Sequence, residues 1–384
     1  MGIYLDHAAT TPVKPAVAEE MQRYLTDRAL MANPFSNHAP GRRAAEEREV
    51  LRLKAANHFM CLPDDVIFNS GGSEGDTHAL VGTAQHFERP IHLAVSAIEH
   101  EAVLEAAGLL AHRGNRVSTI PVTGDGVVPV EAVETLLRDD RPDLVSVMAV
   151  NNEVGTVQPV REIAALCRQS DVVFHSDAVR AVGHGLESIV TDPNITLLNC
   201  TAHKFGGPRG VGALVQRRLR LPQLICGGGQ EQGSRAGTEN LASIAGLASA
   251  LELASAEEAA GIEELRRWLE SELVSQVPSC EIHGKRATRA THITSVSFKP
   301  LSGYKLQAAL DSLGIAVGTG SACHDDGGVS ISPVLAAMGI EEYLARGTLR
   351  LSLGWSTTRE ELEQFLEHFI ELLDQSDDSL NCPI

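Results

Sequence analysis

Short apolar runs rich in β-branched residues alternate with helical patterns between about residue 60 and residue 250. Near-continuous apolar runs separated by helices are typical of a mostly parallel β-sheet that is covered on both faces. In such sheets, ligands bind beyond the carboxyl ends of the strands. We therefore expect an α/β fold with a site at that edge. The predicted strands are residues 66–69, 91–96, 144–150, 172–177, 195–200 and 211–215.

The pattern changes after about residue 249. A long amphipathic helix is predicted over residues 252–277, followed by strands at 294–298 and 347–353. The last helix opens with a capping box formed by Thr358 and Glu361. Its apolar positions recur at helical spacing, which predicts that they are buried: Leu362, Phe365, Leu366, Phe369 and Leu373. We expect a smaller α+β domain of residues 1–14 and 251–384 beside a larger domain of residues 15–250.

Composition narrows the class of protein. The 384 residues are 43% hydrophobic, which is enough for a substantial core, and the net charge is −18. Because a broad nucleic-acid surface requires a basic field, no direct contact with nucleic acid is expected beyond a local patch. No apolar stretch approaches the ~20 residues that span a bilayer, and the N-terminus lacks an apolar signal segment, so a cytoplasmic protein without membrane contact is expected.

The cysteines show no metal-binding spacing. All seven are far apart, the closest two being Cys200 and Cys226. An odd number in a cytoplasmic chain favours free thiols, most of them buried, one of which could be a nucleophile. The 15 histidines form no H-E-x-x-H or comparable spaced set. No metal site is predicted.

Two charged residues follow successive predicted strands. Asp177 ends the run 172–177, and Lys204 lies directly after the run 195–200. Singly, a lysine is usually a surface residue and an aspartate is often a helix N-cap. Together, at the exits of neighbouring buried strands, they are typical of a pyridoxal phosphate site. The lysine forms a Schiff base there, and the aspartate keeps the pyridine nitrogen protonated.

A glycine-rich turn offers a place for a phosphate. Residues 70–76 read Ser-Gly-Gly-Ser-Glu-Gly-Asp, between a predicted strand and a predicted helix. Backbone N–H groups and hydroxyls at a helix N-terminus suit an anion. Such a turn is often purely structural. It lacks the Gly-Lys-Ser/Thr of a Walker loop and the spacing of a G-x-G-x-x-G motif, so a nucleotide site is not indicated.

Ordered motifs along nearly the whole chain resemble the cysteine desulfurases, pyridoxal phosphate enzymes of the aspartate aminotransferase fold (fold type I). Individually the motifs are weak, but their shared order is specific. The matching segments are residues 4–12, 33–34, 70–74, 99–100, 150–155, 175–178, 202–204, 227–231, 235–238, 320–323 and 349–352.

The resemblance implies roles for the residues around the cofactor ring. Lys204 would form the Schiff base and Asp177 would pair with the pyridine nitrogen. Asn152 would lie near the phenolic oxygen and the substrate. His100 would stack on the ring and transfer protons, a role that suits an imidazole near neutral pH.

The resemblance also implies residues for the anionic groups of cofactor and substrate. Arg350 would clamp the substrate carboxylate, which a guanidinium fork suits better than an ammonium. Thr238 would reach the phosphate from a second subunit, which implies a homodimer. The rest of the phosphate cup would consist of Gly72, Ser73, Thr201 and His203.

Cys323 matches the cysteine that carries a persulfide in this family. The implied reaction converts L-cysteine to L-alanine and leaves the sulfur on Cys323. Glycines on both sides of Cys323 suggest a mobile segment. We expect its thiol to lose its proton when this segment docks beside cofactor and substrate, since Asp325 and Asp326 would disfavour the thiolate and His324 would oppose them. The implied sulfur acceptors are proteins of iron–sulfur cluster assembly, tRNA thiolation or DNA sulfur modification.

Arg180 departs from the family pattern, which usually has a glutamine at this cofactor-binding position. Two interpretations follow. The arginine could simply fill the same space and donate one hydrogen bond. Alternatively, a fixed cation near the phenolic oxygen could lower the pKa of the Schiff base.

Two other functions are compatible with the sequence. Cys323-His324-x-Asp, with Ser332 and Pro333 downstream, also resembles selenocysteine lyases, so selenocysteine is the nearest alternative substrate. A chain of this acidity could instead act mainly as a platform for basic sulfur-acceptor proteins. A metal hydrolase is poorly supported because no ligand set is present in the sequence.

Overall fold

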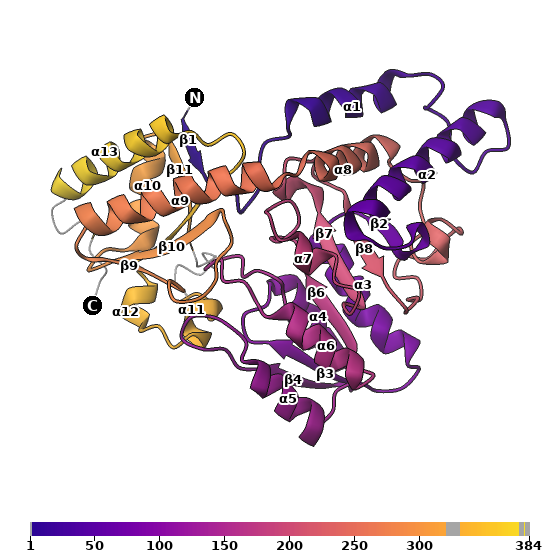
Figure 1. The fold of residues 1–384 in the computed structure, drawn as a ribbon, viewed down its shortest axis with the longest axis horizontal. Helices are drawn as coiled ribbons and strands as arrows, with labels where there is room; N and C mark the ends of the chain where they lie inside the picture. Colours follow the sequence, from indigo (N-terminus) through magenta and orange to yellow (C-terminus); the bar gives the residue numbers. More distant parts are fainter. Residues whose placement is uncertain (1, 320–330, 376–379, 381–384) are drawn as a thin grey trace.

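Two β-sheets organise the chain (Figure 1). The structure, a computed structural model, describes residues 2–319, 331–375 and 380. The larger sheet occupies one half of the molecule together with most of the helices. The smaller sheet lies in the other half, beside the long helices α9 (Ala256–Gln276) and α13 (Arg359–Gln375).

The larger sheet has seven strands in the order β2-β8-β7-β6-β5-β3-β4. Only β8 runs against its neighbours, so the predicted mostly parallel sheet is confirmed. The strands are β2 (Val66–Asn69), β3 (His92–Ser96), β4 (Arg116–Ile120), β5 (Leu144–Ser146), β6 (Val173–Asp177), β7 (Leu197–Thr201) and β8 (Gly212–Gln216).

Helices cover both faces of this sheet, because its strand residues alternate between two apolar cores. Leu93, Leu144 and Leu197 pack against α3 (Gly72–His86) and α4 (Glu101–His112). Their neighbours Ala94, Val145 and Leu198 belong to the opposite core. That core contains residues of α1 (Pro15–Thr26), α2 (Ala39–Phe59), α5 (Val130–Asp139), α6 (Val160–Gln169), α7 (Glu187–Val190) and α8 (Leu241–Leu253).

The smaller sheet is mixed and has the order β1-β11-β12-β10-β9. Its first strand comes from the N-terminus and pairs in parallel with β11. The helices α9, α10 (Gly303–Ser312) and α13 contribute to its apolar core. The strands are β1 (Ile3–Leu5), β9 (Cys280–Ile282), β10 (Ile293–Phe298), β11 (Ile315–Thr319) and β12 (Thr348–Ser352). Two short helices follow β11 along the chain, α11 (Pro333–Ala337) and α12 (Glu342–Ala345).

Some predicted elements have different ends in the structure. The strand expected over residues 144–150 stops at Ser146, and Val150 forms only an isolated bridge with Val157. The helix expected to begin at residue 252 begins at Ala256, because extended Ala254 ends α8 and Ser255 caps α9. The edge strand β4 was missed, since its mostly exposed or half-buried residues lack an apolar run.

The last helix is as expected at its start. Thr358 N donates to Glu361 Oε2 (2.9 Å) and Glu361 N donates to Thr358 Oγ1 (3.2 Å), which confirms the capping box. Of the apolar positions, Leu373 is only partly buried, whereas Leu362, Phe365, Leu366 and Phe369 are buried in the core. None of the helices in the described ranges is both long and apolar enough to cross a membrane.

Candidate active site

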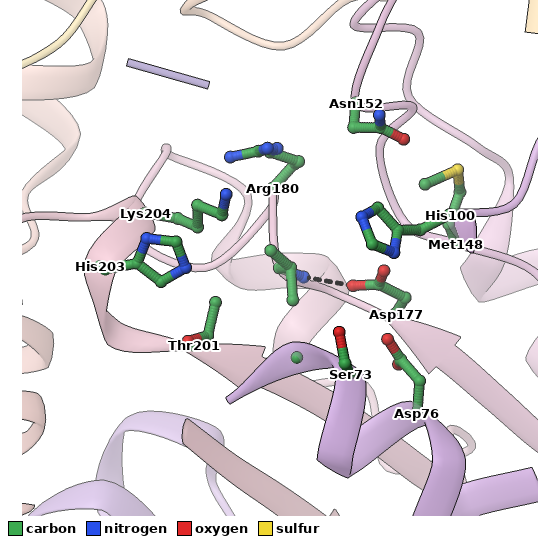
Figure 2. A pocket seen from close by; sticks show the side chains of 12 residues that line it. Ser73, Asp76, His100, Met148, Asn152, Asp177, Arg180, Thr201, His203 and Lys204 are labelled. Atoms are coloured by element: carbon green, nitrogen blue, oxygen red, sulfur yellow. Dashed lines mark hydrogen bonds between the residues drawn. The ribbon is translucent and has the colours of Figure 1, made fainter. Parts of the chain in front are cut away.

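A cavity of about 150 Å³ lies at the carboxyl ends of the central strands of the larger sheet. Asp177 ends β6 and Thr201 ends β7, while α3 begins and α4 is capped beside them. The structure brings nine of the predicted residues together in this cavity (Figure 2). They are Gly72, Ser73, His100, Asn152, Asp177, Arg180, Thr201, His203 and Lys204.

Lys204 lies at the end of a 3₁₀ turn that directly follows β7. Its Nζ donates to the carbonyl oxygens of Ala8 (3.1 Å) and Ala9 (2.6 Å). Burial lowers the pKa of Lys204 to about 6, and the guanidinium groups of Arg180 and Arg350 act in the same direction. A lysine of this kind is mostly uncharged at pH 7 and is therefore a competent nucleophile toward an aldehyde.

Asp177 is buried on the opposite wall of the cavity from Lys204 (Figure 2). Its carboxyl group accepts a hydrogen bond from Val179 N at 2.8 Å. Burial, together with the neighbouring Asp76 carboxyl, raises the pKa of Asp177 to about 6. A cation bound in the cavity would favour the ionised form of Asp177, so the site suits a protonated ring nitrogen.

The N-terminus of α3 forms one end of the cavity. Gly71 precedes this helix at φ 146°, a conformation that favours glycine, and a Cβ there would lie 3.3 Å from Thr201 Oγ1. The free N–H groups of the first turn, with the nearby Ser73 hydroxyl, suit an anion such as a phosphate. His203 lies on the same side as Thr201, with Nδ1 3.1 Å from Thr10 Oγ1.

His100 caps α4 and faces the cavity while remaining accessible to solvent. Its Nδ1 accepts from Ala102 N at 3.1 Å, which leaves Nε2 to exchange a proton. Burial against the cavity wall lowers its pKa, which Asp177 partly opposes. The buried Asn152 Oδ1 finds no hydrogen-bond partner among the described residues. Both side chains are therefore available to a bound molecule.

Arg350 lies in an adjoining hollow of about 420 Å³ that shares His100 and Asn152 with the cavity. Its Nη2 donates to Asp6 Oδ1 (2.8 Å) and its Nη1 to Asn152 O (3.2 Å). The structure thus places Arg350 beside the cavity rather than in its wall, where it could meet a substrate that extends from a bound cofactor.

Besides Arg350, one more described residue of the predicted set, Thr238, is not in this cavity. Thr238 is exposed and lines a separate hollow with Arg235 and Glu239, so its own chain does not bring it to Lys204. Cys323 lies outside the described residues. The chain on either side of its segment, at Gly318 and Thr319 and again at Pro333 and Val334, lines the hollow that contains Arg350.

Three cavity residues had no predicted role: Asp76, Met148 and Val179. Asp76 is buried on α3, where Asn199 Nδ2 donates to its Oδ1 at 3.0 Å. Its Oδ1 also lies 3.4 Å from His175 Nε2. Burial raises the pKa of Asp76 to about 7. Its position one turn after Ser73 on the predicted helix was the available signal. Met148 and Val179 could not be distinguished from core residues.

Metal binding finds no support in the described part of the chain, where no group of three His, Cys, Asp or Glu side chains could hold an ion. By contrast, the cavity fits pyridoxal phosphate. It combines an uncharged lysine, a helix N-terminus, a buried carboxyl for a ring nitrogen, and a buried guanidinium, Arg180, without a partner in the described chain. The fold and the cavity together define a pyridoxal phosphate enzyme of fold type I.

Comparison with known proteins identifies the family. Residues 3–365 match the family model of class-V aminotransferases. The chain is 37% identical over 382 residues to the cysteine desulfurase IscS of Clostridium botulinum, covering 97% of this chain and 94% of that protein. A NifS-like protein of known structure has a TM-score of 0.87 at 35% identity, covering 97% of this chain and all of that one. The structure of SspA in complex with cysteine has a TM-score of 0.80 at 31% identity, with 93% and 100% coverage.

The chain therefore belongs to the class-V aminotransferase family and, within it, to the cysteine desulfurases. Enzymes of this family depend on pyridoxal phosphate, which is accordingly its cofactor.

Proposed function

We propose that this enzyme removes sulfur from L-cysteine, releasing L-alanine and leaving a persulfide on Cys323. The observation that carries the proposal is the single cavity in which Lys204, Asp177 and His100 meet, with Arg350 in the hollow next to it. The relatives named cysteine desulfurase and the cysteine complex of SspA support the same substrate.

Each side chain has a distinct task in this proposal. Lys204 Nζ holds the cofactor, Asp177 provides the negative charge opposite its ring nitrogen, and the first turn of α3 with Thr201 and His203 binds its phosphate. When bound, pyridoxal phosphate supplies an electron sink for the bonds at the substrate α-carbon. Arg350 orients the substrate by its carboxylate.

Proton and sulfur transfer fall to two further residues. His100 Nε2 accepts or returns a proton beside the cavity. The Cys323 thiolate attacks the sulfur of the substrate, so that an S–S bond forms as the substrate C–S bond breaks. The substrate carbon then takes up a proton to give alanine. The atoms balance, since one sulfur leaves cysteine and one is added to Cys323.

Mass spectrometry tests this proposal directly. The holoenzyme is mixed with L-cysteine without reductant, and we expect Cys323 to gain one sulfur as alanine appears. Cys323→Ser should abolish the modification, whereas the same change at the exposed Cys226 should leave it intact. Alanine formation with an unmodified Cys323 would contradict the proposal. Measuring the turnover of L-cysteine and of selenocysteine in parallel distinguishes a cysteine desulfurase from a selenocysteine lyase.

We further propose a homodimer in which Thr238 completes the phosphate site of the partner. Its exposure and its separation from the cavity of its own chain support this arrangement. The test mixes two inactive variants, Lys204→Ala and a Thr238→Trp variant that blocks the partner's phosphate site. Hybrid dimers that contain one unaltered site should recover activity. No recovery in mixtures shown to contain hybrids would contradict the arrangement.

We propose that the larger domain comprises residues 15–250 and the smaller one residues 1–14 and 251–384; the two sheets with separate cores support this division. We also propose that the enzyme acts in the cytoplasm.

We propose that its sulfur acceptors are proteins of iron–sulfur cluster assembly, tRNA thiolation or DNA sulfur modification. Assays that follow sulfur transfer from the Cys323 persulfide to each kind of acceptor would distinguish these three possibilities.

A further inference from the structure

Arg180 is an unpaired cation in the interior of the protein. The residue is only 6% exposed, and its guanidinium makes no hydrogen bond or ion pair within the described residues. It lines the same cavity as Lys204, and Figure 2 shows the guanidinium at the amine end of the Lys204 side chain. Burying a charge without a partner is costly, so a buried and unpaired arginine calls for a functional explanation.

The backbone around Arg180 holds it in this position. The turn that contains it packs against the segment of Lys204, where Gly183 is so close that a Cβ would lie 2.4 Å from Phe205 Cβ. His184 Nε2 lies 3.1 Å from Lys204 O, which joins the two segments a second time. These two contacts fix the turn that contains Arg180 relative to the segment that contains Lys204.

The charges facing Lys204 come from several elements. Arg180 and Arg350 disfavour its ammonium form, whereas Asp177 and Asp6 favour it. Asp6 is already engaged by Arg350 at 2.8 Å. Histidines also face this region: His203 on the Lys204 turn, with a pKa lowered to about 4, and His100 on α4. Among the charged neighbours, Arg180 exerts the largest effect on the Lys204 amine.

We propose that Arg180 is a charge-tuning residue that keeps the Lys204 nitrogen unprotonated. An uncharged amine has the lone pair needed to attack the aldehyde of pyridoxal phosphate. A carbon–nitrogen double bond then forms and the aldehyde oxygen leaves as water. The same fixed cation also disfavours protonation of the nitrogen once the link has formed. The free N–H groups of Arg180 remain able to donate to an oxyanion of the bound cofactor.

The test measures how fast pyridoxal phosphate attaches to Lys204 and does not depend on turnover of a substrate. The proposal rests on the proposed function in one respect, that Lys204 is the residue to which the cofactor attaches. Apoprotein is mixed with pyridoxal phosphate across a pH series, and attachment is followed by absorbance. The wild-type rate should rise with pH around a midpoint near the Lys204 pKa of about 6. In Arg180→Gln the midpoint should rise by about one pH unit, which makes attachment ~5-fold slower at pH 6.

Titration of the holoenzyme gives a second readout. The pH midpoint of its visible absorbance change should likewise be higher in Arg180→Gln than in the wild type. Arg180→Lys, which keeps a cation, should restore most of both shifts. Arg209→Gln removes an equal charge from an exposed position in the loop after Lys204 and should leave both midpoints in place. Circular dichroism establishes that each variant is folded.

The outcomes separate this proposal from the proposed function. Borohydride reduction followed by peptide mass spectrometry should locate the cofactor on Lys204 in every variant. If Lys204 is unlabelled in the wild type, the proposed function itself is wrong. If Lys204 is labelled but Arg180→Gln leaves both midpoints unchanged or lowers them, only the role of Arg180 is overturned.

Discussion

Arg350 and Asp6 form an ion pair in which Arg350 Nη2 lies 2.8 Å from Asp6 Oδ1, although 344 positions separate them in the sequence. The pair joins the N-terminal segment to β12 at the edge of the candidate active site. A second bond, from Arg350 Nη1 to Asn152 O at 3.2 Å, fixes the plane of the guanidinium. Asp6 thereby orients the group proposed to bind the substrate carboxylate.

Replacing Arg350 by lysine should weaken substrate binding, because an ammonium cannot form the two-pronged contact of a guanidinium with a carboxylate. Loss of a charge-assisted hydrogen bond predicts a fall of about 10- to 100-fold in kcat/KM for L-cysteine, mainly through KM. The absorbance of the bound cofactor should be unchanged. Arg359→Lys, at a surface pair with Glu363, is the control and should have no effect. An unaltered KM in Arg350→Lys would rule out the carboxylate role.

Asp76 should control the pH at which Asp177 ionises. Burial, with a smaller contribution from the Asp76 carboxyl, raises the pKa of Asp177 to about 6, so Asp76→Asn should lower that pKa. Noncovalent binding of pyridoxal phosphate, measured in the Lys204→Ala background, should weaken as pH falls through 6 because Asp177 becomes protonated. Adding Asp76→Asn should move this loss of affinity to lower pH. If the pH at which affinity is lost does not change when Asp76→Asn is added, Asp76 does not act on Asp177.

The sequence predicted the centre of this site because of strand order. β6 and β7 are adjacent and parallel, with Asp177 opposite Asn199 in register, so the residues at their ends had to lie together. Asp76 was missed because its inward direction depends on how α3 packs, and its position one turn after Ser73 was the only hint of that direction in the sequence. The role proposed for Thr238 rests on family resemblance, since its own chain does not bring it to the cavity.

Element ends were harder to predict than elements. The apolar run at 144–150 continues beyond β5 because Val147, Met148 and Ala149 are buried. The paired register with β3 and β6 ends at Ser146, although Val147 N and Ala149 N still donate to His175 O (3.1 Å) and Asp177 O (2.8 Å). Burial fixes the apolar character of such residues, but hydrogen bonding to neighbouring strands decides where a strand ends. The edge strand β4 shows the reverse case: it is paired along one side with β3, yet it lacks an apolar run.

A buried histidine pair should make stability sensitive to acid. His292 stacks on His184 with ring centroids 3.6 Å apart, and burial holds the pKa of His292 well below its ordinary value. At pH values between the ordinary histidine pKa near 6.5 and the lower pKa of His292 in the folded protein, His292 is protonated in the unfolded chain but not in the folded one. The contribution of His292 is therefore fully present above pH 6.5 and lost as pH falls. Unfolding free energies of wild type and His292→Phe should differ in slope by about 1.4 kcal/mol per pH unit.

The comparison isolates one group because the other titrating residues are common to both proteins. Buried carboxyls with raised pKa values, such as Asp76 and Glu99, titrate in the opposite sense but cancel in the difference. His86→Phe, the same change at an exposed position, should leave the slope of the wild type unaltered. Equal slopes for wild type and His292→Phe between pH 4.5 and 6 would contradict the prediction.

Gly75 should tolerate no side chain, because α3 passes directly over Asn199 at this point. A Cβ on Gly75 would lie 1.8 Å from Asn199 Oδ1, while Asn199 Nδ2 donates to Gly72 O (2.9 Å) and Asp76 Oδ1 (3.0 Å). Gly75→Ala must displace Asn199 and break its hydrogen bonds to Gly72 and Asp76, which line the cavity. Urea unfolding should therefore show a fall of about 1–3 kcal/mol in the free energy of unfolding, although alanine has the better helix propensity. Gly108→Ala on α4, where a Cβ would meet no atom within 4 Å, should instead add about 0.5–1 kcal/mol. If Gly75→Ala proved as stable as the wild type, the close approach of α3 to Asn199 would be refuted.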